Sequence, residues 1–384
     1  MSGQRKPTMR RVLMILGVSL MVVVAGCGGM GAGGADSDDE AGPNDAETMG
    51  EDAETDGTDD EDDDQSETDV GTDDAGGTLE IHAIDVGQAD ATLLVGPEET
   101  MLIDSGDWRD DGDRVIDYLD EQGVDRIDYL VSTHAHADHI GGHAAVIEHY
   151  ETERDGVGQV WDPGVAHTSQ TYENYLDAVD EHGVDLIEAQ AGDEIALADG
   201  ATVLNPPADR ESDDLHDNSL ALRVSHGESS FLATGDAEEG AEQRMVEEYG
   251  DELASDVYHA GHHGSSTSST PAFLDRVDPE LALISSAYDS QYGHPHDEVL
   301  ESFAERGIET YWTAVHGSVV LESDGEEFTI ESGTDATTDP AGIEDEPPAE
   351  DGAVESVRPM ATGMTSAASA VSVPSEVEAT GAIA

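Results

Sequence analysis

Hydrophobic residues of this chain gather between about residue 78 and residue 332, where short apolar runs alternate with amphipathic stretches. The short runs are rich in Val, Ile and Leu, which is typical of strands. We expect strands at Leu79–Val86, Ala91–Val95, Thr100–Asp104, Ile127–Val131, Glu194–Leu197, Ala201–Asn205, Ser219–Ser225, Ser230–Thr234, Asp256–Ala260, Leu281–Ser285, Ile308–Thr313, Ser318–Leu321 and Phe328–Ile330. Helical spacing and helix start signals predict helices at Asp113–Gln122, Thr168–Gly183, Glu238–Tyr249 and Asp297–Arg306. A further helix should end at about Tyr150, and another should begin at Pro271. Strand-rich halves, each followed by helices, indicate an α/β fold in which two sheets pack face to face with helices outside.

Residues 1–27 have the pattern of an export signal. Basic residues precede Val12–Val24, an apolar run that is short for a membrane span but suits the hydrophobic part of a signal peptide. The run ends in Val24-Ala25-Gly26-Cys27, which resembles a lipobox and would make Cys27 the lipidated residue. The pair Arg10-Arg11 is compatible with twin-arginine export. An uncleaved N-terminal anchor is the alternative, and both interpretations predict that the rest of the chain lies outside the cytoplasm.

Two low-complexity segments flank the middle region. Residues 28–77 contain mainly Gly, Asp, Glu and Thr with almost no large apolar side chain, so they are predicted to form a disordered acidic linker. Residues 333–384, rich in Ala, Gly, Ser, Pro and acids from Pro340 onward, are predicted to be a disordered tail. The folded domain is therefore expected to span residues 78–332.

The charge balance of the chain is extreme. It has 14 Lys and Arg residues against 89 Asp and Glu residues, for a formal net charge of −75 at pH 7. Self-repulsion is screened within about 3 Å at 1 M salt, while net charge maintains solubility. The pattern resembles that of proteins of halophilic archaea and predicts a protein that is unstable at low salt. The single cysteine, Cys27, excludes an internal disulfide.

A polar cluster follows the apolar run Ile127–Val131. The order of strand, loop and helix start predicts that His134 and His136 leave the strand end, while Asp138 and His139 lie in the first turn of the next helix. Imidazole and carboxylate groups suit Zn²⁺ and similar divalent ions. The division into two pairs suits two metals held side by side, as in metal-assisted hydrolysis. A polar surface loop is the alternative, and this spacing makes it the weaker one.

The segment Thr-His-Ala-His-Ala-Asp-His-Ile-Gly-Gly at residues 133–142 resembles the H-x-H-x-D-H signature of the metallo-β-lactamase fold superfamily. The resemblance implies an αββα four-layer sandwich, in agreement with the two sheets predicted above. It also implies that Asp236, at the end of an expected strand, bridges two metals, with a helix cap as a compatible second role. Asp138 and Asp236 are therefore expected to be catalytic.

Further motifs are similar to those of the extracellular β-lactamase-like domain of the competence protein family, which is attached to a DNA-uptake channel. They are DVGQAD at 85–90, LIDSG at 102–106, FLATGD at 231–236, HHGS at 262–265 and YGHP at 292–295. They run in the family's order over about Leu79–Thr313. The helices of the channel have no counterpart, because no long apolar run follows residue 24.

The resemblance gives supporting positions to other carboxylates. Asp104 occupies the superfamily's first motif position and is expected to orient a metal-bound histidine or its loop. Asp85 is placed in the same supporting shell. For Asp85 and Asp90, a hydrogen-bonding role in a turn and a catalytic role both stay open.

The remaining ligands are less sharply defined by the sequence. His262 and His294 follow successive expected strands, and at least one of them should complete the second metal site. His263 ranks behind them as a ligand and is expected to contact substrate instead. Ser265 belongs to a Ser- and Thr-rich segment before a helix start, which is either an anion site or a plain surface loop.

The first metal lacks an obvious third histidine. His216 is one candidate ligand, and Asn218 is another, because the competence family tends to place Asn in this region; Asn218 is equally a candidate substrate contact. A second departure concerns His136, where the family commonly has Asp. The predicted ligand set for two Zn²⁺ ions, with Mn²⁺ as an alternative, is His134, His136, Asp138, His139, Asp236, His262, His294 and His216.

These interpretations predict a metal-dependent hydrolase anchored by lipid on the extracellular face of the membrane, or secreted. A metal-bound hydroxide would attack a phosphodiester, and the competence resemblance favours extracellular DNA. No basic patch is visible, although molar salt would screen phosphate attraction in any case. The alternatives are a hydrolase of a lactone, thioester or β-lactam, and a non-catalytic surface module that accompanies a separate DNA-uptake channel.

Overall fold

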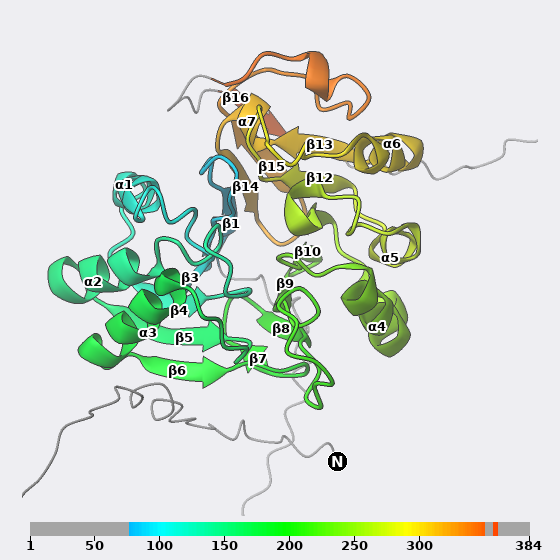
Figure 1. Cartoon of the computed structure of the whole chain (residues 1–384). Helices are drawn as coiled ribbons and strands as arrows, with labels where there is room; N and C mark the ends of the chain where they lie inside the picture. The colour runs from blue at the N-terminus through cyan, green and yellow to red at the C-terminus, as the bar shows by residue number, and fades with distance from the viewer. Residues whose placement is uncertain (1–76, 350–355, 360–384) are drawn as a thin grey trace, which may run out of the picture. The chain divides into compact units, whose positions relative to one another are not determined.

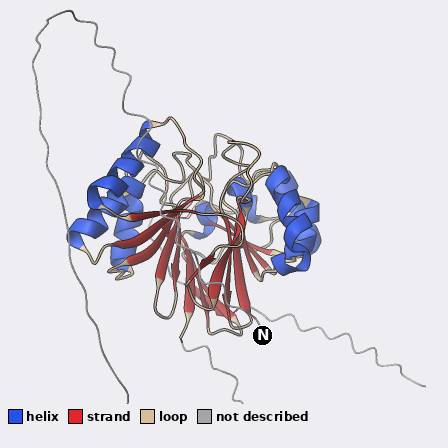
Figure 2. Ribbon diagram, turned by 90° about the horizontal axis from the view of Figure 1, so that it is seen from below, coloured by secondary structure: helices blue, strands red, loops and turns tan. Residues whose placement is uncertain are grey.

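Two β-sheets lie face to face, and helices cover the outer surface of each sheet (Figures 1 and 2). This computed structural model describes residues 77–349 and 356–359, and its layers confirm the predicted αββα sandwich. The predicted export signal, the lipidation site Cys27 and nearly all of the acidic linker lie outside the described residues. Within the described part, no helix is both long enough and apolar enough to cross a bilayer.

The first sheet joins an antiparallel part to a parallel part. In spatial order, its nine strands within the described residues are β16 (Ser356–Pro359), β15 (Phe328–Ser332), β14 (Val319–Ser323), β1 (Leu79–Ala83), β2 (Thr92–Val95), β3 (Thr100–Ile103), β4 (Ile127–Val131), β5 (Val157–Asp162) and β6 (Asp185–Glu188). Neighbours from β16 to β3 pair antiparallel, and neighbours from β3 to β6 pair parallel. The helices on its outer face are α1 (Asp113–Glu121), α2 (His143–Glu153) and α3 (Gln170–His182).

The second sheet repeats this division. Its seven strands within the described residues are, in spatial order, β13 (Glu309–Trp312), β12 (Leu281–Ile284), β11 (Val257–His259), β10 (Ser229–Ala233), β9 (Ala221–His226), β8 (Gly200–Asn205) and β7 (Glu194–Ile195). Neighbours from β13 to β10 pair parallel, and the others pair antiparallel. The helices that follow these strands are α4 (Glu239–Tyr249), α5 (Pro271–Val277), α6 (Asp297–Arg306) and α7 (Thr313–His316), together with the short 3₁₀ turns η1 (Gly250–Leu253) and η2 (Gly261–Gly264).

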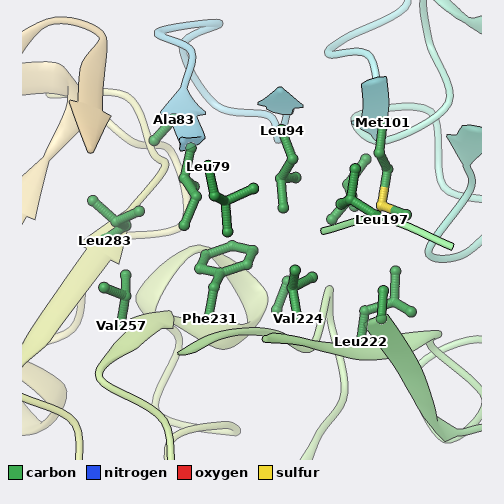
Figure 3. Packing of buried hydrophobic residues seen from close by; sticks show 14 of the residues in the cluster. Leu79, Ala83, Leu94, Met101, Leu197, Leu222, Val224, Phe231, Val257 and Leu283 are labelled. Carbon is green, nitrogen blue, oxygen red and sulfur yellow. The ribbon is translucent and has the colours of Figure 1, made fainter. Parts of the chain in front are cut away.

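The core between the sheets is built by the two-residue period of strands. Leu79 and Ala83 of β1 are fully buried and point toward the second sheet, where Phe231 of β10 and Val224 of β9 lie opposite (Figure 3). Ile81 of β1 is fully buried in the same cluster. Burying one such side chain is worth about 1.5–3 kcal/mol relative to leaving it in water. This apolar layer holds the two sheets in a fixed relation, so loops at their common edge can be positioned accurately.

The sequence pattern did not predict β5 and β6. Gly158 and Gln159 interrupt the apolar run of β5, and both are only partly buried. β6 is the last strand of its sheet and exposes Asp185. Edge strands of this kind carry little apolar signal because one side is open to water. The helix α3 between them was predicted, and it begins with the Ser169 hydroxyl accepting the Tyr172 N–H.

The ordered chain also continues beyond residue 332, which corrects the predicted start of the disordered tail. Ile343 lies in the short 3₁₀ turn η3 (Ile343–Asp345) and is fully buried. The Thr310 N–H donates to the Thr338 carbonyl at 2.9 Å, and β16 pairs with β15. One buried isoleucine in an otherwise acidic segment gives no periodic pattern, so composition alone suggested disorder.

Candidate metal centre

The loop after β4 gathers the imidazole and carboxylate groups of the H-x-H-x-D-H segment. Asp138 and His139 lie in a turn and not, as predicted, in the first turn of a helix, because α2 begins only at His143. The N–H groups of His139 and Ile140 both donate to the His136 carbonyl, at 3.2 and 3.1 Å. This tight turn folds the second pair of side chains back toward the first.

Glycines behind the turn allow the backbone to pack closely against the loop after β3. A Cβ on Gly141 would lie 2.1 Å from the Trp108 nitrogen, and one on Gly142 would lie 2.6 Å from the Ser105 carbonyl oxygen. The Gly141 N–H donates to the Gly106 carbonyl at 3.0 Å. The metal loop is therefore held by main-chain contacts that leave no room for a side chain.

A first cluster combines three histidines with the aspartate after β10. The candidate ligand atoms of His134, His136, His216 and Asp236 all lie within 4.8 Å of one another. His134 Nε2 is 2.8 Å from His136 Nδ1 and 3.4 Å from Asp236 Oδ2. His216 Nε2 is 3.3 Å from His136 Nδ1. The structure therefore favours His216 as the third histidine, and the Asn218 amide instead donates to loop carbonyls at 2.7 and 3.0 Å.

A second cluster lies against the other oxygen of the same aspartate. It contains Asp90, His139, Asp236 and His263, all of them buried, with ligand atoms again within 4.8 Å. His139 Nε2 is 3.2 Å from Asp236 Oδ1, and Asp138 Oδ2 lies 3.5 Å from His263 Nε2. Because its two oxygens face two different clusters, Asp236 has the geometry of a bridging carboxylate.

The buried polar atoms of the second cluster test whether a metal fits. Asp90 Oδ1, His139 Nε2, Asp236 Oδ1 and His263 Nε2 are all buried, and within the described residues none of them has a hydrogen-bond partner. A buried polar atom left in this way costs about 1–3 kcal/mol. A divalent cation among them would satisfy all four at once, and nitrogen and oxygen donors suit zinc and related metals. The donor set fits a metal.

Protonation in the first cluster favours neutral imidazoles. Burial lowers the pKa of His136 to about 4, and nearby His134 and His216 act in the same direction. Burial also lowers the pKa of His134. A histidine ring must be neutral to bind a metal. Because these rings are already neutral at pH 7, they can bind a metal without first releasing a proton.

The carboxylates of the centre are held ionised. Burial raises the pKa of Asp236, but the charges of His139, His134 and His263 outweigh it and hold that pKa well below its usual range. Burial likewise opposes ionisation of Asp138, but the nearby His263, whose Nε2 lies 3.5 Å away, and His139 outweigh it, so this pKa is also lowered. In both cases positive charge beside the carboxylate favours the anion that a metal requires.

Two neighbouring histidines after β11 lie in different groups of candidate ligands. His263, expected to contact substrate, joins the second cluster, whereas His262 lies in a third group with His216 and Glu238. His262 and His263 both have positive φ, 52° and 57°. Such consecutive left-handed residues are uncommon outside glycine and aim the two neighbouring imidazoles at different groups of the centre. No sequence pattern indicates this backbone, so the sequence alone could not show that the two histidines belong to different groups.

His294, the other predicted ligand, lies beside the clusters and belongs to none of the three groups defined by the described residues. Its Nδ1 is 3.4 Å from Gln88 Nε2, and its ring stacks on that of His263 with centroids 6.2 Å apart. Ser265 is buried, and its hydroxyl lies 3.1 Å from that of Thr267, so it supports its own turn.

Asp104 makes the contact expected of a supporting carboxylate. Its Oδ2 lies 2.7 Å from His139 Nδ1, and its two oxygens accept the Thr133 N–H and hydroxyl at 2.8 and 2.6 Å. This arrangement leaves His139 Nε2 free to face Asp236. Asp85 Oδ1 accepts the Gly87 N–H at 3.2 Å, as in a turn, and Asp85 is outside the three groups of described residues.

Sequence reasoning missed Glu238 and left Asp90 undecided. Glu238 Oε1 lies 3.2 Å from His216 Nδ1 and 3.4 Å from His262 Nδ1. A carboxylate in this position fixes each ring with Nδ1 as donor, so that Nε2 faces the centre. The sequence offered one signal for each residue. Glu238 lies two residues after Asp236, and Asp90 is the last residue of the DVGQAD motif.

Comparison with known proteins agrees with this geometry. Residues 84–287 match the family described as "Metallo-beta-lactamase superfamily". The chain is 29% identical over 259 residues to "ComE operon protein 3" of Bacillus subtilis, covering 62% of this chain and 32% of that protein. It is 30% identical over 240 residues to "Competence protein ComA" of Neisseria gonorrhoeae, covering 61% of this chain and 31% of that protein. The chain thus matches about a third of the length of these relatives.

Solved structures similar to this chain include "Igni18, a novel metallo hydrolase" from Ignicoccus hospitalis. It is 18% identical, with a TM-score of 0.41, and the alignment covers 64% of this chain and 98% of that one. A "Diphosphatase from the PhnP Family" is 15% identical with a TM-score of 0.35, over 58% of this chain and 91% of that one. The family match covers more than half of the sequence and includes the H-x-H-x-D-H loop, Asp236 and His263, and the chain belongs to the metallo-β-lactamase superfamily.

Proposed function

We propose that this protein is a metal-dependent phosphodiesterase that acts outside the cytoplasm, with extracellular DNA as a candidate substrate. The observation that carries the proposal is Asp236, whose Oδ1 and Oδ2 face two separate groups of candidate ligands. These groups would hold two divalent ions, Zn²⁺ or Mn²⁺, and such ions would supply Lewis-acid chemistry and an activated water for phosphodiester hydrolysis. The similarity to competence proteins supports a nucleic-acid substrate.

The chain's own residues set the geometry of this chemistry. Asp104 and Thr133 fix the ring of His139, and Glu238 fixes those of His216 and His262. His262 Nε2 lies 3.5 Å from Asp236 Oδ2, and the side chain of His262 is 20% exposed. An entering phosphate oxygen can therefore reach it, as it can reach His216, whose side chain is 25% exposed.

A substrate panel in molar KCl tests the proposal. The purified protein should contain close to two transition-metal ions and hydrolyse a generic phosphodiester, with loss of activity after chelation and recovery after metal is returned. Lactone, thioester and β-lactam substrates should react at least about a hundredfold more slowly. A protein that binds metal but prefers one of these esters or amides would identify the other class of hydrolase. Absence of bound metal would favour a non-catalytic module beside a DNA-uptake channel.

The proposed location rests on Cys27, which follows Val24-Ala25-Gly26. We propose that a lipid on this cysteine anchors the protein to the outer surface of the membrane of a salt-adapted cell. Cys27→Ser should move the protein from the membrane fraction to the medium or stall its processing, as seen by fractionation and blotting. An unchanged distribution would exclude the lipid anchor.

A further inference from the structure

Two exposed aromatic residues of the described chain, Trp108 and Tyr292, contact segments that carry predicted ligands of the metal centre. Among the described residues, the large apolar side chains that are exposed are Trp108, Tyr288 and Tyr292, at 53%, 38% and 58% of their surface. All three are aromatic, in a chain where Phe, Trp and Tyr make up only 4% of the residues. An exposed aromatic side chain next to a candidate metal centre is available to contact a ligand bound there.

Trp108 is tied to the metal loop through its backbone. Its N–H donates at 3.0 Å to the carbonyl of Ala137, which stands between His136 and Asp138. The Arg109 guanidinium lies 4.9 Å from the centre of the Trp108 ring. This main-chain contact ties Trp108 to the loop that carries the candidate ligands, and more than half of the Trp108 surface is open to solvent.

Tyr292 stands at the rim on the loop after β12, in the other sheet. Its ring lies 5.7 Å from that of His294, which in turn lies 6.2 Å from the ring of the candidate ligand His263. Tyr288, on the same loop, differs from it. Its ring stacks on Trp312 at 5.6 Å and 11°, and its hydroxyl donates to the Glu346 carbonyl, so Tyr288 is part of the fold.

We propose that Trp108 and Tyr292 form a stacking platform for the bases of a single-stranded nucleic acid whose phosphodiester lies at the metal centre. This inference rests on the proposed phosphodiesterase function. Aromatic side chains hold bases of any sequence, because every base has a π-face. The two rings come from different sheets, so bases on both sides of the scissile phosphate can be held at once.

The charge of the chain explains why rings would be used here in place of basic residues. With a net charge of −75 and 14 Lys and Arg, the protein offers little attraction for phosphates, and molar salt would screen what attraction exists. Stacking does not depend on net charge. It therefore gives affinity for nucleic acid under conditions in which a basic groove would give almost none.

The test compares a single-stranded oligothymidine with an abasic oligomer of the same length and the same phosphates, using the full metal-bound protein in molar KCl. We expect kcat/KM to be at least about tenfold higher for the base-bearing strand, since stacking one base contributes that much or more to affinity. Trp108→Ala and Tyr292→Ala should each remove most of this preference. Trp108→Phe and Tyr292→Phe keep a ring and should preserve it.

Tryptophan fluorescence supplies a readout that needs no hydrolysis. Of the three tryptophans in the chain, Trp161 and Trp312 are buried, at 8% and 3% exposure, so Trp108 should report stacking alone. In rapid mixing, oligothymidine should quench the emission and the abasic oligomer should not. Trp108→Phe should abolish this quenching.

The outcomes separate the two proposals. Equal hydrolysis of both oligomers without base-dependent quenching would overturn the platform and leave the phosphodiesterase standing. Base-dependent quenching without hydrolysis of either oligomer would support the platform and overturn the phosphodiesterase. Because the comparison between oligomers uses the unaltered protein, the platform can be rejected even when a variant fails to fold.

Discussion

Asp236 joins the two halves of the candidate centre at a single carboxylate. It follows β10, its N–H donates to the Ser219 hydroxyl at 3.0 Å, and the preceding Gly235 has φ of 50° and no room for a Cβ beside Thr133. The backbone therefore leaves the carboxylate only one direction, into the space between the histidines. A residue of this kind determines whether one metal or two can be held.

Asp138 can be removed with little effect on the fold, because it lies in a turn and its side chain is 31% exposed. Asp138→Ala should lower phosphodiester hydrolysis by at least about a hundredfold, since a bound metal stabilises the transition state by several kcal/mol and each 1.36 kcal/mol is about tenfold in rate. The assay is steady-state hydrolysis in high salt. The exposed Asp289 provides a control, and Asp289→Ala should keep full activity. Hydrolysis within a few-fold of the parent, with an unchanged circular dichroism spectrum, would remove this loop from the chemistry.

Glu238 offers a second test at the same scale, because its Oε1 contacts both His216 and His262. Glu238→Ala should weaken metal affinity by about 10–100-fold, as is usual when the partner of a metal-bound histidine is lost. Glu238→Gln retains an oxygen that can accept an Nδ1–H and should lose less. Competition with a chromogenic chelator measures the affinity, and Glu239→Gln, one residue away and exposed, is the control. If Glu238→Ala binds metal as tightly as the parent, this carboxylate does not orient the ligands.

Sequence reasoning could identify the residues whose positions follow from a local motif. His134, His136 and His139 were identified from their spacing after a strand, and Asp236 from the resemblance to the superfamily. The choice of His263 over His262 and His294 depends on two residues with positive φ, and the recruitment of Asp90 depends on how the loop after β1 meets β11. Neither can be derived from residue types along one chain.

At the level of elements, strands with a continuous apolar pattern were predicted and the weak ones were missed. β1, β4 and β12 carry mostly buried residues. β5 and β6 were overlooked because they are amphipathic or lie at an edge, and α3 was predicted without the strands that it connects. The positions of β5 and β6 therefore depend on contacts with neighbouring elements, because their own residues give little pattern.

One such contact is Asp162 at the end of β5, which accepts the Gly164 N–H at 2.6 Å and the Tyr175 hydroxyl of α3 at 3.3 Å. Burial raises the pKa of Asp162 to about 6, and these two hydrogen bonds only partly oppose it. The folded state therefore binds this proton more tightly than the unfolded state. Its contribution to stability is present below about pH 4 and is lost as the pH rises through 6, by up to about 3 kcal/mol.

Asp162→Asn should remove this pH dependence, since the amide can accept the Gly164 N–H and donate to the Tyr175 oxygen without titrating. Denaturant unfolding in molar KCl from pH 4 to pH 7 measures the effect as the difference between variant and parent. The exposed Asp180 of α3 is the control, and Asp180→Asn should leave the profile unaltered. Parallel profiles for Asp162→Asn and the parent would show that Asp162 stays ionised in the fold.

For the whole molecule, the αββα arrangement followed from two strand-rich halves, and the family match agrees with it. The extent of the domain was less predictable. The segment around Ile343 has a composition that predicts disorder, but the burial of Ile343, the hydrogen bond to Thr338 and the pairing of β16 show that it belongs to the fold. Composition describes the surface of a protein well, but a few long-range contacts can decide where its domain ends.

The same composition predicts how the whole protein responds to salt. A net charge of −75 destabilises the compact state by self-repulsion, and the distance over which charges interact falls from about 30 Å at 0.01 M salt to about 3 Å at 1 M. The melting temperature should therefore rise steeply up to about 1 M KCl. Above that concentration, a weaker rise is expected only with salts that strengthen apolar burial, such as sulfate.

Scanning calorimetry in KCl and in potassium sulfate at equal ionic strength separates the two effects, and sucrose, which screens no charge, is the control. A melting temperature equal in 0.1 M and 1 M KCl would show that repulsion between carboxylates does not limit the stability of this fold.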